Sequence, residues 1–170
     1  MKKFDVIVIG SGGGSKITSP AAKLGFKVAV IEKGPLGGTC LNRGCIPSKM
    51  LIHPAEVALA VREAHKFDIQ NNPQFKVDFA KLVQRISKTV DGDSASISAG
   101  YQRNQNITYY ASEGKFISNK VLQVAGEEIT ADKIFITVGA RPQIPAIAGL
   151  AGTPYMTSTE ALRNITLPKK

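Results

Sequence analysis

The two cysteines of this chain, Cys40 and Cys45, lie five positions apart in the glycine-flanked segment GGTCLNRGCIPSK (residues 37–49). Thiols this close could form a structural disulfide, provide half of a metal site, or act as a redox-active pair. On a continuous α-helix, residues five apart have Cα atoms about 8.7 Å apart, whereas a disulfide needs less than about 7 Å. A bridge therefore requires a break in the helix. Pro47 predicts one, because it has no N–H to donate to the carbonyl of residue 43.

The surroundings of the cysteines favour redox chemistry over the other two readings. A short loop constrains little of the unfolded chain, so a structural disulfide would stabilise the fold inefficiently. Zinc needs four ligands, and the spacing of the cysteines is wider than usual, with His53 and His65 not completing a set. A helix that begins near Pro47 would place Cys45 just before its N-terminus, where partial positive charge favours a thiolate. Zinc and an inert thiol pair stay as alternatives.

A glycine-rich motif, Gly10-Ser11-Gly12-Gly13-Gly14-Ser15, fits G-x-G-x-x-G with serine in the last place. It follows a buried apolar run (residues 4–9) and precedes a predicted helix (15–24), a second buried strand (27–31) and Glu32. This context is the dinucleotide-binding fingerprint: glycines for a tight turn at a pyrophosphate, and a carboxylate for a ribose hydroxyl. The motif leaves FAD and NAD(P) open. An ordinary strand–turn–helix without ligand is the alternative.

The elements that would position these motifs alternate in the manner of an α/β protein. Helices are predicted over residues 48–66, with a kink at Pro54, and over 78–89, with Asp78 as cap and a break at 71–74 between them. Residues 91–104 could extend the second helix or form a loop. Short strands follow at 108–111, 115–117, 121–124 and 128–130, then a buried strand at 133–138 and a loop-rich tail with a short helix near 159–163. We expect a Rossmann-like parallel sheet with flanking helices and a small antiparallel β excursion.

Composition limits the possible classes of protein. With 170 residues, 43% hydrophobic and 21% charged, the chain suits a soluble globular domain. No secretory signal or apolar run of about 18 residues is present, so a cytoplasmic location is expected. The net charge of +9 invites a nucleic-acid reading, but the basic residues are scattered. We expect no nucleic acid, membrane or metal partner.

Together the segments FDVIVIGSGGGS, AVIEKGPLGGTCLNRGCIPSKML and ADKIFITVGARPQIP resemble the flavin-dependent pyridine nucleotide–disulfide oxidoreductases over most of the chain. The resemblance implies FAD as cofactor, Cys45 as the thiol facing the flavin and Cys40 as the thiol that exchanges with substrate. The cofactor-binding residues it implies are Gly10, Gly12, Gly14, Ser15, Glu32, Lys33, Gly38, Thr39, Lys49, Gly114, Val138, Gly139 and Ala140.

The family also implies a function: electrons pass between NAD(P)H or NAD+, FAD and the Cys40–Cys45 disulfide to a thiol or disulfide substrate. Dihydrolipoamide dehydrogenase is the expected activity of a full-length, homodimeric parent. Mercuric or mycothione reductase, or a stand-alone flavin-binding redox sensor, are the alternatives. The chain is expected to be the N-terminal part of the FAD domain (1–32, 37–104, 107–142 and tail 143–170), inactive alone, with the nicotinamide and dimerisation domains absent.

Three positions depart from the family pattern. Ser15 replaces a glycine or alanine, Pro20 lies within the first predicted helix, and Val138 stands where a threonine is common. We expect looser packing of the first helix and the loss of one hydroxyl contact at Val138.

Overall fold

The computed structural model describes residues 1–70 and 74–169 and divides by its contacts into two compact units. The first, which we call the sheet unit, comprises Met1–Asn42 and Asp91–Arg141. The second, the helical unit, comprises Arg43–Val90 and Pro142–Lys170.

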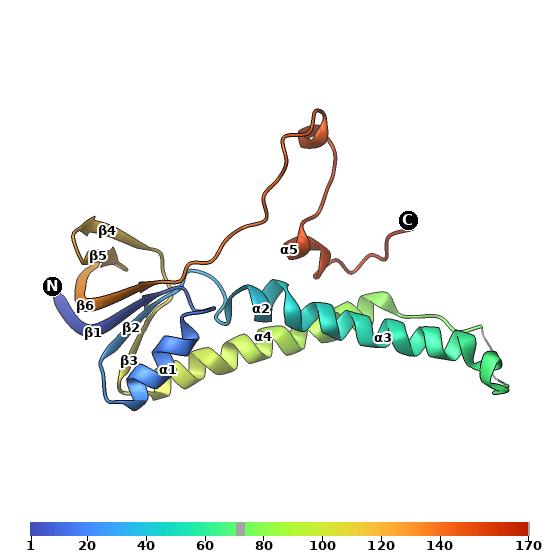
Figure 1. Cartoon of the computed structure of the whole chain (residues 1–170), viewed down its shortest axis with the longest axis horizontal. Helices are drawn as coiled ribbons and strands as arrows, with labels where there is room; N and C mark the ends of the chain where they lie inside the picture. The colour runs from blue at the N-terminus through green and yellow to red at the C-terminus, as the bar shows by residue number, and fades with distance from the viewer. Residues whose placement is uncertain (71–73, 170) are drawn as a thin grey trace. The chain divides into compact units, whose positions relative to one another are not determined.

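The sheet unit is built on one six-stranded sheet of order β3-β2-β1-β6-β5-β4 (Figure 1). Its parallel strands are β1 (Lys2–Ile9), β2 (Val28–Ile31), β3 (Ile107–Tyr110) and β6 (Glu127–Ile136). β5 (Val121–Val124) runs antiparallel to β6, and β4 (Gly114–Ser118) antiparallel to β5. The α/β class, the parallel sheet and the antiparallel excursion predicted from the sequence are confirmed.

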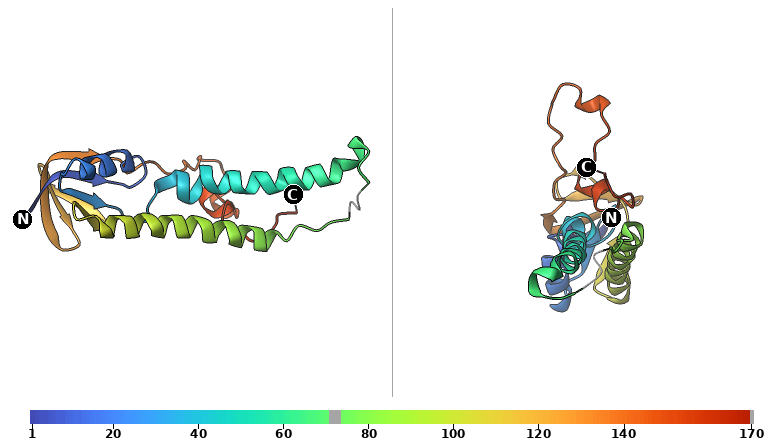
Figure 2. Two further views of the ribbon diagram at one scale, coloured as in Figure 1. Left: turned by 90° about the horizontal axis from the view of Figure 1, so that it is seen from below. Right: turned by 90° about the vertical axis from the view of Figure 1, so that its right-hand side faces the viewer.

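Both faces of β2 and of the central part of β1 are buried, which explains their continuous apolar sequences. On β2 the side chains alternate: Val28 and Val30 lie in one core cluster, and Ala29 and Ile31 in the other. The first cluster is covered by α1 (Ser15–Lys23) and by Tyr101 near the end of α4 (Phe79–Arg103), and the second by β5. Figure 1 shows α1 and the last turns of α4 below the strands, and the left panel of Figure 2 gives the view from that side.

In the sheet unit the structure settles one boundary that the sequence left open, and one predicted boundary is wrong. Residues 91–103 are helical and extend α4 to Arg103, because Ile97 and Tyr101 pack on the sheet. The strands predicted at 128–130 and 133–138 are one strand, β6, since residues 129–136 pair with β1 while residues 127–130 pair with β5.

Three further α-helices and two 3₁₀ turns complete the fold over the described residues. They are α2 (Gly38–Arg43), α3 (Cys45–Glu63), a 3₁₀ turn (Ala64–Phe67) that continues α3, and α5 (Ser158–Ala161), with a second 3₁₀ turn at Leu150–Gly152. Asp78 caps α4 as predicted, accepting a hydrogen bond from the Lys81 amide at 3.0 Å. Of the break predicted at 71–74, residues 71–73 lie outside the described residues. Every described helix is too short or too polar to cross a membrane.

Candidate functional site

The turn between β1 and α1 has no room for side chains at two of its glycines. Gly10 has φ +98°, and a Cβ there would lie 2.3 Å from the carbonyl oxygen of Thr137. A Cβ on Gly14 would lie 2.2 Å from the Gly10 oxygen. Only glycine fits these positions, so the turn is held tightly against the end of β6.

This turn also presents unused hydrogen-bond donors. Among the described residues, the amides of Gly12, Gly13 and Gly14 have no acceptor, whereas those of Ser15 and Lys16 bond to the carbonyls of Gly12 and Gly13. The Ser15 hydroxyl donates to the Gly12 carbonyl at 2.9 Å. Three unpaired N–H groups at the N-terminus of α1 form a site for an anion such as a pyrophosphate.

The cysteine-bearing segment packs directly on this turn. A Cβ on Gly38, the first residue of α2, would lie 2.4 Å from the Cα of Gly12, and Gly38 has φ +65°. Thr39 and Cys40 follow on α2, and both are exposed. The glycine turn and Cys40 therefore belong to one packed arrangement within the sheet unit.

Glu32 lies at the end of β2, beside the glycine turn. Its Oε2 accepts hydrogen bonds from the Ser11 amide at 3.0 Å and the Ser11 hydroxyl at 2.9 Å. Its Oε1 accepts one from the Gly34 amide at 3.0 Å. Burial, and secondarily the charge of Glu32, raise the pKa of Tyr109 above its ordinary value. Three hydrogen bonds thus fix the carboxylate beside the glycine turn.

Lys33 and Gly114 lie around the same end of β2. Lys33 Nζ forms a 2.8 Å ion pair with Glu113, and its hydrogen bond lowers the pKa of that carboxyl. A Cβ on Gly114 would meet Ile31 Cγ2 at 3.2 Å, so glycine allows β4 to start close to β2.

Two residues that the sequence did not single out hold this site together. The Thr137 hydroxyl lies 2.9 Å from the Ile9 carbonyl and 2.8 Å from the Gly10 carbonyl, and the two carbonyls share its single hydrogen. Val138, the next residue, is 67% exposed. Gly139 (φ +70°) and the exposed Ala140 follow it.

Asn42 is the second such residue. Its buried side-chain nitrogen lies 2.9 Å from the Leu36 carbonyl, 3.0 Å from that of Gly38 and 3.3 Å from that of Pro35, and these three acceptors share its two hydrogens. Its Oδ1 is buried and has no partner among the described residues. Asn42 therefore fixes the loop that leads to Cys40.

The helix break predicted between the cysteines is confirmed, but α3 begins earlier than expected. Cys40 lies in α2, and Gly44 (φ −148°, ψ −114°) ends that helix before α3 starts at Cys45. The expected start near Pro47 is wrong by two residues, because proline is tolerated throughout the first turn. Of the predicted site residues, Cys45 and Lys49 belong to the helical unit, and all others belong to the sheet unit. Cys45 is exposed.

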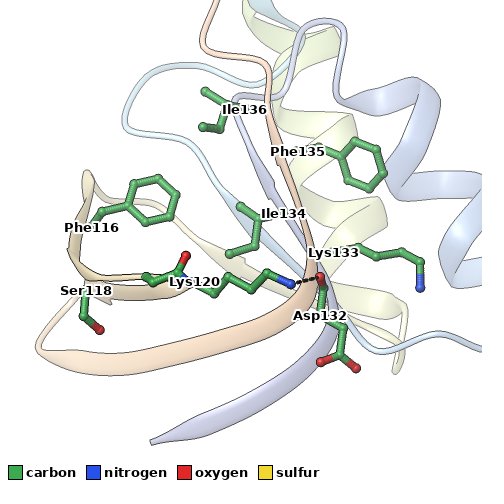
Figure 3. Close-up of a pocket in the computed structure, with 9 residues that line it drawn as sticks. Phe116, Ser118, Lys120, Asp132, Lys133, Ile134, Phe135 and Ile136 are labelled. Atoms are coloured by element: carbon green, nitrogen blue, oxygen red, sulfur yellow. Dashed lines mark hydrogen bonds between the residues drawn. The ribbon is translucent and has the colours of Figure 1, made fainter.

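A further hollow of the sheet unit lies away from the predicted site residues. A groove of about 670 Å³ runs between β4 and the later part of β6, lined by Phe116, Lys120, Ile134 and Ile136 among others (Figure 3). None of its lining residues is a predicted site residue. The volume of a groove therefore does not identify the candidate site. We identify the site from the unpaired amides, the fixed carboxylate and the close glycine contacts.

A parallel sheet with a glycine turn, a helix N-terminus and an acidic residue at the end of the second strand defines a dinucleotide-binding fold. The family model described as "Pyridine nucleotide-disulphide oxidoreductase" matches residues 4–170. The chain belongs to this family. FAD is the family's cofactor, as predicted, and the site fits it: the turn offers donors for a pyrophosphate and a carboxylate for a ribose.

Individual relatives agree with the family. The chain is 37% identical to a dihydrolipoyl dehydrogenase of Chlamydia trachomatis over 98% of its length and 37% of the relative's. It is also 37% identical to a mercuric reductase of Shigella flexneri, over 97% of its length and 30% of the relative's. A solved structure, the HOCl-induced flavoprotein disulfide reductase RclA from Escherichia coli, superposes with a TM-score of 0.80 and 32% identity over 96% of this chain and 35% of that one. The chain thus spans about a third of the length of these relatives.

Proposed function

We propose that this chain is the FAD-binding and redox-active-disulfide part of a flavoprotein disulfide oxidoreductase. The contact between Gly38 and Gly12 carries the proposal, since it joins the segment that leads into Cys40 to a turn with three unpaired amides.

Each predicted residue has a role in this proposal. Gly12 and the α1 N-terminus would hold the pyrophosphate, Glu32 would accept a hydrogen bond from the adenosine ribose, and Gly10, Gly14 and Ser15 shape the turn. The remaining proposed cofactor residues are Lys33, Gly38, Thr39, Lys49, Gly114, Val138, Gly139 and Ala140.

When bound, FAD supplies reversible two-electron chemistry. The disulfide between Cys40 and Cys45 takes up two electrons and two protons, which breaks its S–S bond and leaves two thiols. The Cys40 thiolate then attacks a substrate disulfide, forming a mixed disulfide and releasing one substrate thiol. The Cys45 sulfur attacks Cys40 in turn, which restores the protein disulfide and releases the second thiol.

For the full-length protein we propose dihydrolipoyl dehydrogenase activity, in which this sequence runs in reverse and NAD+ receives the electrons. The similarity to the chlamydial dihydrolipoyl dehydrogenase supports it. Mercuric reductase activity is the second candidate, because the Shigella relative has the same identity. Assays of the full-length protein with dihydrolipoamide and NAD+, and with Hg(II) and NADPH, separate the two. A homodimer and a cytoplasmic location stay predictions.

A flavin-uptake and thiol assay on the 170-residue chain tests the proposal. After incubation with FAD and removal of the excess, we expect the visible flavin spectrum to stay with the protein. Since Cys40 and Cys45 are the only cysteines, we expect two accessible thiols after reduction and none after mild oxidation. Glu32→Gln should weaken FAD binding by about tenfold. Glu56→Gln, which alters an exposed carboxylate near His53, is the matched control. A chain that takes up no FAD, or that keeps both thiols after oxidation, would contradict the proposal.

A further inference from the structure

Ser11 lies inside the glycine turn and is only 2% exposed. Its amide and its hydroxyl both donate to Glu32 Oε2, at 3.0 and 2.9 Å. The same hydroxyl accepts a hydrogen bond from the Gly37 amide at 3.1 Å. One buried side chain thus connects the turn after β1, the end of β2 and the loop before α2.

These bonds leave the two oxygens of Glu32 unequal. A carboxylate oxygen accepts about two hydrogen bonds. Both positions on Oε2 are taken by Ser11, whereas Oε1 accepts only from the Gly34 amide at 3.0 Å. One acceptor position, on Oε1, is therefore left for a ligand.

We propose that Ser11 is a positioning residue that sets selectivity for the ribose of an adenine nucleotide. By occupying Oε2, Ser11 fixes the Glu32 carboxylate so that Oε1 accepts from one ribose hydroxyl. The inference rests on the proposed function, because it takes Glu32 as the ribose acceptor. Ser11 itself does not touch the nucleotide.

Removing the Ser11 hydroxyl should act through Glu32. The carboxylate would keep the Ser11 amide but lose a second donor, and the Gly37 amide would lose its acceptor. The carboxylate could then turn, and its geometry toward a ribose hydroxyl would no longer be fixed. The loss of affinity should therefore be confined to ligands that carry that hydroxyl.

Calorimetric titration of the 170-residue chain with ADP, 2′-deoxy-ADP and 3′-deoxy-ADP tests this, with no need for bound flavin. The wild type should bind ADP about tenfold more tightly than one of the two deoxy nucleotides, because a hydrogen bond to a charged group is lost. Ser11→Ala should reduce that preference to about threefold or less. The affinity for ADP should fall, while the affinity for the deoxy nucleotide should stay within about twofold of the wild-type value. Ser94→Ala, which removes a hydroxyl of similar burial on α4, should leave the preference unchanged.

The outcomes are distinct. If Ser11→Ala keeps the full preference for ADP, or lowers the affinity for all three nucleotides equally, Ser11 does not position Glu32 and the inference is wrong. If the wild type binds ADP without preference, the inference fails while nucleotide binding stands. If the wild type binds neither ADP nor FAD, the proposed function fails as well. Should Ser11→Ala not fold, Ser11→Gly removes the same hydroxyl and suits a glycine turn.

Discussion

Gly38 and Gly12 touch through their backbones, so that a Cβ on Gly38 would lie 2.4 Å from the Gly12 Cα. Because the obstructing atom is backbone, no side-chain rotation can relieve the contact. The φ of +65° at Gly38 adds to the cost of any side chain there. Glycine at position 38 therefore determines how closely the cysteine-bearing segment approaches the glycine turn.

Gly38→Ala should push the two segments apart. We expect a loss of about 1–3 kcal/mol in the free energy of unfolding and a fall of at least about tenfold in FAD affinity. Urea unfolding and flavin fluorescence titration measure the two effects. FAD affinity equal to that of the wild type would show that this contact does not shape the site.

Gly92→Ala makes the same chemical change where a Cβ meets nothing within 4 Å, in the interior of α4. Alanine has lower conformational entropy in the unfolded chain and a higher helix propensity than glycine. We expect the free energy of unfolding to rise by about 0.5–1 kcal/mol, with FAD affinity unchanged. A destabilised Gly92→Ala variant in urea unfolding would contradict the α4 helix at this position.

Thr137→Val removes the hydroxyl that donates to the Ile9 and Gly10 carbonyls while keeping a branched side chain. We expect the free energy of unfolding to fall by about 1–2 kcal/mol, because two carbonyls at the turn lose their shared donor. FAD affinity should fall with it, since Gly10 begins the nucleotide turn. Thr153→Val, whose hydroxyl donates to the Gly149 carbonyl on the exposed tail, is the control. Equal effects of the two variants in urea unfolding and flavin titration would mean that the Thr137 bonds do not support the turn.

The sequence predicted the parts of the fold whose signals are local. The apolar runs of β1 and β2 and the glycines between them indicate buried parallel strands without any tertiary information. The later half of α4 has no such signal, because DGDSASISAG is rich in residues of low helix propensity. Packing of Ile97 and Tyr101 on the sheet overrides that propensity.

The residues of the site likewise divide into those that a local motif identifies and those that only the folded structure reveals. Glu32, Gly10 and Gly12 lie in a motif with fixed spacing, so the sequence identifies them. Thr137 acts on residues 127 and 128 positions away, and no local pattern shows that contact. Asn42 lies inside the cysteine segment, but its three bonds to backbone carbonyls depend on how the loop folds.

Because of Tyr110, we expect the free energy of unfolding of the sheet unit to fall at alkaline pH. Its side chain is 8% exposed, and its hydroxyl donates to Glu127 at 2.8 Å. Burial first, and then the hydrogen bond and charge of Glu127, raise the pKa of Tyr110 from 10.0 to about 12. The folded state therefore holds this proton more tightly than the unfolded state. The resulting stability is fully present below the unfolded pKa and is lost as the pH rises from 10.0 toward about 12.

Tyr110→Phe tests this dependence, because phenylalanine keeps the edge-on ring contact with Phe4 and has no proton to lose. The wild type should lose free energy of unfolding between about pH 9 and about pH 11, and the variant should lose about 1 kcal/mol less. Urea unfolding at the two pH values measures the difference. Tyr155→Phe, on an exposed tyrosine, should keep the full alkaline loss of the wild type. An alkaline loss in Tyr110→Phe as large as that in the wild type would show that Tyr110 does not hold its proton more tightly in the folded state.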